Sequence, residues 1–233
     1  CDVQAVEWAD VIVNLTGESI AEGRWTARRK KRIRESRVKS LELLYACVQK
    51  ADKKPAVLIS ASAVGYYGTQ NKKEGYVEED APGADFLSDV CLQWEQAAAA
   101  FNNLGCRVVT LRLGVVISEQ GGMLKKLLLP AKLGVYVVFG NGNNPLPLIH
   151  IDDLVRMMLF LIKNLHVSGV YNAVAPSEHT QLSFVKSIKK NKTGFVIKLP
   201  QTIVKLLFGE MSILLLEGVN VKSNKIQDSG FVF

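Results

Sequence analysis

The sequence predicts an α/β protein with a Rossmann-like, doubly wound parallel sheet and a smaller C-terminal substrate lobe. Two observations support this fold class. Short apolar runs rich in β-branched residues recur along the chain and are bounded by polar or glycine residues, as is typical of strands buried on both faces of a sheet. Segments with helical spacing of apolar residues separate these runs, and strand–helix–strand repeats of this kind favour right-handed crossovers and a parallel sheet covered by helices.

Four strands are predicted for the main sheet, with helices between them. The helix after the first strand begins at Thr26, a suitable N-cap, and its apolar residues keep near-helical spacing up to the turn before Pro55. The next helix is predicted to have Ser88 as its N-cap and to end at Gly105. The predicted strands span residues 11–15, 57–62, 107–117 and 169–174.

The pattern changes after Gly121 and Gly122. A short amphipathic helix and a loop rich in glycine and asparagine follow, and then Asp152 is a suitable cap for a strongly apolar helix. A further strand is predicted near residues 195–199. The predicted division of the chain is a Rossmann-like domain of residues 1–120 and 149–176, incomplete at its N-terminus, and a smaller substrate-side lobe of residues 121–148 and 177–233.

The composition indicates an ordinary globular protein, with 48% apolar and 22% charged residues. A net charge of +7 is compatible with an anionic partner such as a nucleotide phosphate. The basic cluster at residues 28–32 has no interleaved aromatic residues and no accompanying nucleic-acid-binding signature, so we interpret it as a solvated helix face and predict no nucleic-acid partner.

The four cysteines are far apart in the sequence and form no C-x-x-C or Cys/His cluster, so neither a disulfide framework nor a metal site is predicted. No run reaches the about 18 consecutive apolar residues of a membrane span. We therefore expect a cytoplasmic protein without a membrane partner. Because the chain starts with Cys1 and soon enters an internal type of strand, we also expect that a preceding segment is missing.

Hydroxyl and phenol groups gather after the strand at residues 57–62. Ser60 and Ser62 lie at its carboxyl end, and Tyr66 and Tyr67 follow between glycines. In open α/β sheets ligands bind outside the carboxyl ends of the strands, so this stretch is a candidate site. The alternative interpretation is an ordinary buried strand followed by a glycine-rich turn.

A set of characteristic segments occurs in order along nearly the whole chain. They are DVIVNLTGE, W-T-x-x-x-K-x-R-I-x-x-S-R, LISASAVGYYG, the pair Trp94-Glu95, L-R-L-G-V-V, LIHIDDL and GVYNAVAP. In these segments the chain resembles the extended short-chain dehydrogenase/reductase superfamily, and more closely its epimerase-like branch, sometimes labelled cell-division-inhibitor-like.

This resemblance implies a nicotinamide dinucleotide cofactor, and we expect NADP, with NAD as the alternative. Arg32 and Arg37 would supply positive charge near the adenosine ribose, where a guanidinium suits a phosphate. Surface solubility is the alternative explanation of these arginines. Six further residues are expected to border the cofactor: Leu15 and Thr16 at the adenosine, Ser60 and Ala61 at the nicotinamide ribose, and Gly114 and Val115 at the nicotinamide.

Two features of the family are absent from these residues. The family's glycine-rich G-x-x-G-x-x-G turn does not occur, and we expect that the chain begins after it; the alternative is a short form that binds no dinucleotide. The family's Tyr/Lys pair is replaced by Leu87 and Cys91, and Cys91 is interpreted as a buried packing residue. Lys72 is close enough in sequence to fold back toward the tyrosines.

Ser62 matches the family's catalytic serine. We therefore predict hydride transfer on a small carbonyl or alcohol substrate, with Ser62 binding the substrate oxygen and Tyr66 or Tyr67 transferring the proton. A phenol without a neighbouring lysine stays protonated near neutral pH, so reduction should be favoured over oxidation. His150 is a further acid/base candidate, although a histidine beside a helix cap explains it as well. The alternative function is a catalytically inactive nucleotide-binding sensor or interaction protein, and the substrate and oligomeric state stay unassigned.

Overall fold

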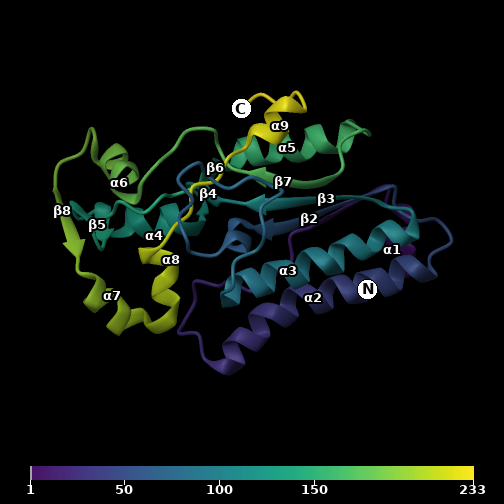
Figure 1. The fold of residues 1–233 in the computed structure, drawn as a ribbon, viewed down its shortest axis with the longest axis horizontal. Helices are drawn as coiled ribbons and strands as arrows, with labels where there is room; N and C mark the ends of the chain where they lie inside the picture. The colour runs from purple at the N-terminus through teal and green to yellow at the C-terminus, as the bar shows by residue number, and fades with distance from the viewer. Residues whose placement is uncertain (1) are drawn as a thin grey trace.

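The computed structural model describes residues 2–233, apart from the side chains of residues 122, 123 and 125–127. A four-stranded parallel sheet of order β1-β2-β3-β7 forms its centre (Figure 1). The strands are β1 (Val11–Asn14), β2 (Val57–Ala63), β3 (Arg107–Leu113) and β7 (Gly169–Ala173). The predicted Rossmann-like fold class and the parallel pairing of the first two strands are confirmed.

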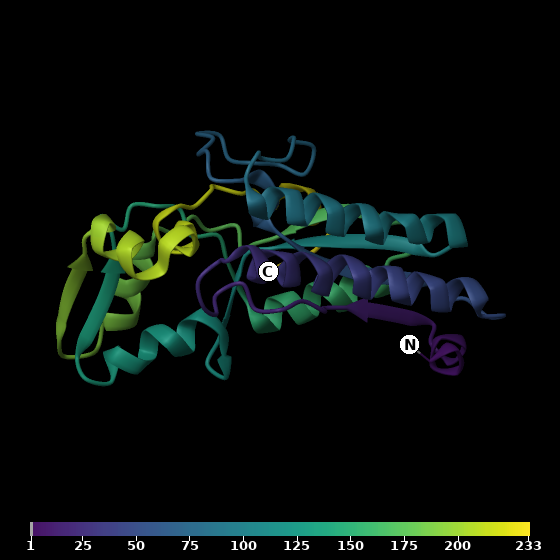
Figure 2. The same cartoon turned by 90° about the horizontal axis from the view of Figure 1, so that it is seen from below.

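Helices cover both faces of this sheet (Figures 1 and 2). The alternation of side chains along a strand decides which helix each residue meets. Leu58 packs in a core cluster with Trp94, whereas Ile59 packs in a different cluster with Met157. The two helices of the first face are α2 (Ala27–Lys50) and α3 (Phe86–Ala99), and the opposite face carries α5 (Ile151–Lys163).

Three helix starts show how short polar side chains set the boundaries. Thr26 caps α2, as predicted. For α3 the prediction was wrong by one turn: the carboxylate of Asp85 accepts a 2.9 Å hydrogen bond from the backbone N–H of Ser88, so Asp85 is the cap. For α5 the cap is His150, whose Nδ1 accepts from the backbone N–H of Asp152 at 3.3 Å. Asp152 therefore lies in the first turn, where its negative charge interacts favourably with the helix dipole.

The strand predicted over residues 107–117 is interrupted at Gly114. β3 ends before it, and β4 (Val115–Ser118) pairs instead with β6 (Leu148–His150). The backbone N–H of Val115 donates to the carbonyl of Pro147 at 2.7 Å, and a Cβ at position 114 would lie 2.7 Å from that same oxygen. The chain can change partners here because glycine allows this close approach.

A second group of elements lies beside the main sheet, at the left of Figure 1. Its strands β5 (Val135–Phe139) and β8 (Phe195–Leu199) pair in parallel, so the predicted strand at residues 195–199 is confirmed and β5 is an addition. The helices here are α4 (Gly122–Ala131), α6 (Gln181–Lys189), α7 (Gln201–Phe208) and α8 (Ile213–Leu216), with the 3-10 helix η3 (Gly209–Ser212).

The end of the chain returns to the main sheet through α9 (Asn224–Asp228). Ile226 and Phe231 belong to the same core cluster as Val109, although the predicted division assigned residues 177–233 to the smaller lobe. The remaining elements are the short helix α1 (Val3–Trp8) and the 3-10 helices η1 (Val64–Tyr67) and η2 (Ala100–Leu104). None of the helices in the described part of the chain combines the length and apolarity needed to cross a membrane.

Candidate functional site

A cleft of about 250 Å³ opens at the carboxyl ends of β2 and β3. Gly114 and Val115, predicted to border the nicotinamide, both line it. Its walls are mainly apolar and come from η1, α3, β4 and α8. The carboxyl ends of the strands are the place where open parallel sheets bind ligands. Its apolar lining includes Ile20, Val64, Leu87, Val90, Cys91, Trp94, Leu113, Leu146, Ile213, Leu214 and Val219.

Arg37 is the cation in the lining of this cleft. Its guanidinium lies 5.0 Å from the centre of the Trp94 ring, and its Nη1 donates to the carbonyls of Ile33 and Glu18 at 2.9 and 3.1 Å. Burial lowers the pKa of Arg37, but a guanidinium stays charged at neutral pH. The sequence placed Arg37 near the adenosine ribose, whereas the structure places it in the same cleft as Gly114 and Val115.

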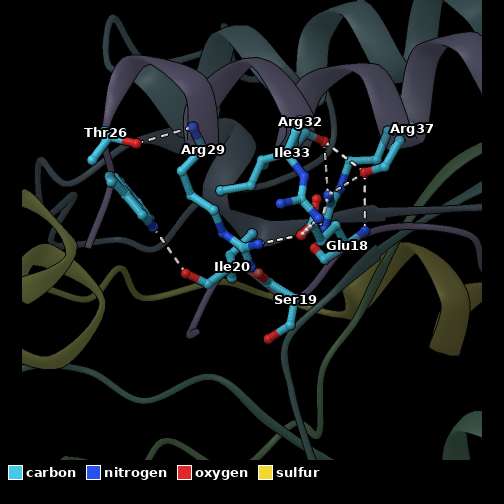
Figure 3. Close-up of polar contacts among 10 residues, drawn as sticks. Glu18, Ser19, Ile20, Thr26, Arg29, Arg32, Ile33 and Arg37 are labelled. Carbon is cyan, nitrogen blue, oxygen red and sulfur yellow. Dashed lines mark hydrogen bonds and ion pairs between the residues drawn. The ribbon is translucent and has the colours of Figure 1, made fainter. Parts of the chain in front are cut away.

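A cluster of arginines holds the loop after β1 against α2. In Figure 3, Arg29, Arg32 and Arg37 project from α2 toward the loop that contains Glu18. The Glu18 carboxylate pairs with Arg29 and, at 2.9 Å, with Arg32. The backbone N–H of Glu18 donates to Ser36 Oγ at 2.9 Å. The basic cluster is thus not simply a solvated face, because Arg29 and Arg32 hold the loop that continues to Ile20, a residue of the cleft lining.

The other predicted cofactor residues do not line the cleft. Leu15 is exposed, and the hydroxyl of Thr16 donates to Asn14 Oδ1 at 2.7 Å at the open end of β1. Ser60 and Ala61 are buried within the sheet, where Ser60 Oγ donates to the carbonyl of Ala61 at 3.2 Å. Contacts of these four residues with a cofactor stay a prediction.

Ser62, Tyr66 and Tyr67 come together around a buried arginine that the sequence reasoning missed. Arg112 is 3% exposed. Its Nε donates to Oε1 of Glu95 and its Nη2 to Oε2, each at 2.9 Å. Ser62 Oγ donates to the same carboxylate at 2.7 Å. The signal for this network was an arginine inside an apolar strand, since a buried charge requires a partner.

The two tyrosines differ in how they meet Arg112. The Tyr67 hydroxyl accepts from Arg112 Nη1 at 2.9 Å and donates to Asn172 Oδ1 at 2.7 Å, and burial raises the pKa of Tyr67 to about 12. The Tyr66 ring lies against the guanidinium, 3.4 Å from its central carbon, and its hydroxyl has no hydrogen-bond partner among the described residues. Ser62, Tyr66 and Tyr67 lie beneath the cleft wall rather than on it.

Three further candidates have other roles in the structure. Cys91 is 4% exposed at the cleft wall and burial raises the pKa of its thiol to about 12, which confirms its interpretation as a packing residue. His150 is the cap of α5. Lys72 pairs with Asp80 at 2.7 Å and not with a tyrosine hydroxyl. Among residues 2–233, no group of three or more His, Cys, Asp and Glu side chains is arranged to hold a metal ion.

A second cavity of about 340 Å³ lies on the other side of the chain at residues 145–147. It is more polar, and two of its charged groups already have partners: Lys72 pairs with Asp80, and Glu178 with Lys222. We place the candidate site in the first cleft because that cleft is apolar and lies at the strand ends.

A parallel sheet with helices on both faces and a cleft at the carboxyl strand ends defines a Rossmann-like α/β protein. Residues 3–173 match the family described as the NAD dependent epimerase/dehydratase family, and residues 199–233 match a domain of unknown function, DUF1731. The chain belongs to the NAD dependent epimerase/dehydratase family. The resemblance to extended short-chain dehydrogenases/reductases is thereby confirmed.

Named relatives support this membership. The chain is 37% identical over 230 residues to epimerase family protein SAR0825 of Staphylococcus aureus, covering 96% of this chain and 75% of that protein. It is 36% identical over 235 residues to epimerase family protein Mb2239 of Mycobacterium bovis, covering 100% of this chain and 77% of that protein. The structure of human epimerase family protein SDR39U1 (isoform 2) with NADPH superposes with a TM-score of 0.88 at 31% identity, covering 97% and 77% of the two chains.

Proposed function

We propose that this protein is an NADP-dependent oxidoreductase or epimerase-like enzyme that acts by hydride transfer on a small carbonyl or alcohol compound. The observation that supports this function best is the cleft at the ends of β2 and β3, in a fold shared with a human relative whose structure contains NADPH. When bound, the nicotinamide would supply or accept the hydride.

The cleft residues fit the nicotinamide end of such a cofactor. The nicotinamide ring is flat and largely apolar, and Leu113, Gly114 and Val115 form a narrow apolar wall at the strand ends. Gly114 adds no side chain to this wall, and the space that a Cβ would take is filled by the carbonyl of Pro147 and a methyl group of Val174. Leu15 and Thr16 lie on the exposed end of β1 and would border the rest of the dinucleotide.

Tyr66 is the proposed proton donor, and because it lies beneath the cleft wall, its hydroxyl would reach the substrate only after a movement of η1. Its hydroxyl is unpartnered among the described residues, whereas the hydroxyls of Ser62 and Tyr67 are held by Glu95, Arg112 and Asn172. Under this proposal Ser62 and Tyr67 support the orientation of Arg112, against which the Tyr66 ring lies. Ser62 would bind substrate oxygen directly only after its hydroxyl leaves Glu95.

The proposal is tested by cofactor binding and turnover. NADPH and NADH are titrated into the 233-residue chain and into a chain extended at its N-terminus by a family glycine-rich strand–helix unit. Tighter binding of NADPH, followed by NADPH oxidation with members of a carbonyl panel, is the expected result. Equal binding of the two cofactors would contradict the NADP preference. Cofactor binding without turnover across the panel would instead support a non-catalytic nucleotide-binding protein.

A further inference from the structure

Arg37 presents a positive charge to the cleft without a directly paired carboxylate; Glu18, which pairs with Arg29 and Arg32, acts on it only at longer range. Its Nη1 is bonded to the carbonyl oxygens of Ile33 and Glu18 and approaches Ser36 Oγ, and its Nε and Nη2 have no hydrogen-bond partner among the described residues. The backbone of Gly17 lies so close that a Cβ there would be 2.9 Å from the central guanidinium carbon. The guanidinium is therefore fixed in position but has free donors.

Neighbouring arginines of α2 are paired differently. Arg29 and Arg32 both pair with the Glu18 carboxylate, and Arg34 pairs with Asp89 at 2.7 Å. No carboxylate oxygen within the described chain lies within 4.0 Å of an Arg37 nitrogen. Since removing a cation from water without pairing it costs free energy, this half-buried guanidinium is suited to accept an anion from a ligand.

The rest of the cleft limits what that ligand can be. Two carboxylates line it: Asp85 is occupied as the cap of α3, and Glu217 is exposed at the edge. The other walls are mainly aliphatic, with the Trp94 ring behind the guanidinium. A ligand that matches this lining has an apolar body and a single negatively charged end.

We propose that Arg37 binds the anionic end of the substrate, and that the substrate is a small carbonyl compound with an apolar body and one carboxylate group. The two unoccupied donors, Nε and Nη2, lie on one edge of the guanidinium and match the two oxygens of a carboxylate. The identity of the reacting carbonyl rests on the proposed function, but the charge-dependent binding does not.

The test uses benzoylformate, an apolar oxo acid, and its uncharged methyl ester as probes, with binding measured by calorimetry. Wild-type protein should bind the acid about tenfold or more tightly than the ester. Arg37→Gln should weaken binding of the acid by about tenfold or more while leaving the ester unchanged, and Arg37→Lys should retain part of the preference because it keeps the charge but not the planar pair of donors. Arg28→Gln is the matched control, since Arg28 is exposed on the same helix and its removal changes the net charge equally.

A dinucleotide phosphate could also use this guanidinium, so NADPH is titrated into the same variants. Unchanged NADPH affinity in Arg37→Gln supports the substrate assignment. A tenfold loss of NADPH affinity with unchanged binding of the acid would assign the anion to the cofactor and overturn the proposal. Equal binding of acid and ester by the wild type, or no binding of the acid, would also overturn it. Arg37-dependent binding of the acid without any NADPH oxidation would support this inference and contradict the proposed function.

Discussion

The guanidinium of Arg112 and the carboxylate of Glu95 form a buried bidentate ion pair, with both hydrogen bonds 2.9 Å long. The side chains are 3% and 11% exposed, so both charges have lost most of their water. The Tyr67 hydroxyl and the carbonyl of Glu78 satisfy the third guanidinium nitrogen at 2.9 and 3.0 Å. This network joins β3 to α3 directly beneath the candidate site.

Removing the carboxylate should strongly destabilise the fold. Glu95→Ala leaves the Arg112 charge buried without a partner, and we expect a loss of about 3–5 kcal/mol in the free energy of unfolding, measured by urea denaturation. Glu35→Ala is the control, because its pair with Lys39 on α2 lies in solvent and should contribute far less. An equal effect of the two substitutions would show that the buried pair does not stabilise the fold.

Alkaline pH should destabilise the protein through Tyr67. Burial raises the pKa of Tyr67 to about 12 in the folded chain, against about 10 for an unfolded tyrosine. A raised folded pKa gives stability that is complete below about pH 10 and is lost as the pH rises toward about 12, by about 2–3 kcal/mol in total. Denaturation at about pH 8 and about pH 10.5 should therefore show a larger loss for wild type than for Tyr67→Phe. Parallel pH dependence of the two proteins would contradict this assignment.

The two tyrosines should separate chemistry from stability. Tyr66→Phe should lower the rate of NADPH-dependent reduction by about 100-fold or more with little change in melting temperature, because the hydroxyl has no partner to lose. Tyr67→Phe should instead cost about 1–3 kcal/mol of stability, because Arg112 and Asn172 each lose a hydrogen bond. If both variants and the double variant keep the full rate, neither phenol is the acid.

The junction between β3 and β4 should not tolerate a side chain. In Gly114→Ala the new Cβ would lie 2.7 Å from the carbonyl oxygen of Pro147 and 2.9 Å from a methyl carbon of Val174. We expect a loss of about 1–3 kcal/mol by urea denaturation. Gly121→Ala is the control because a Cβ there meets no atom within 4 Å. A neutral effect of Gly114→Ala would show that Pro147 and Val174 can move away from position 114 without loss of stability.

Local sequence pattern was enough to predict the parallel sheet, because buried strands and amphipathic helices differ in the spacing of apolar residues. It could not predict the interruption at Gly114, because the cause is the carbonyl of Pro147, which comes from a distant part of the chain. The pairing of β5 with β8 depends in the same way on residues about sixty positions apart.

The candidate site was predicted in part for the same reason. Gly114 and Val115 line the cleft because they directly follow a strand of the sheet. Ser62 also lies near the end of a strand, but its hydroxyl donates to Glu95, which is paired with Arg112 in a buried network. Neither Glu95 nor Arg112 is near Ser62 in the sequence, so the sequence pattern could not predict this network. Arg37 was predicted to bind the cofactor, and this stays a prediction; a helical pattern does not indicate which cleft its guanidinium reaches.

The most direct measurement is the affinity for NADPH when the cleft is filled. Val115→Trp would place a large ring in the cleft, and Val155→Trp adds the same ring on the exposed side of α5. In the chain extended by the glycine-rich unit, we expect NADPH to bind wild type and Val155→Trp equally and Val115→Trp about tenfold or more weakly. Equal NADPH affinity in all three proteins, or no NADPH binding by the wild type, would contradict the proposal that this cleft holds the nicotinamide.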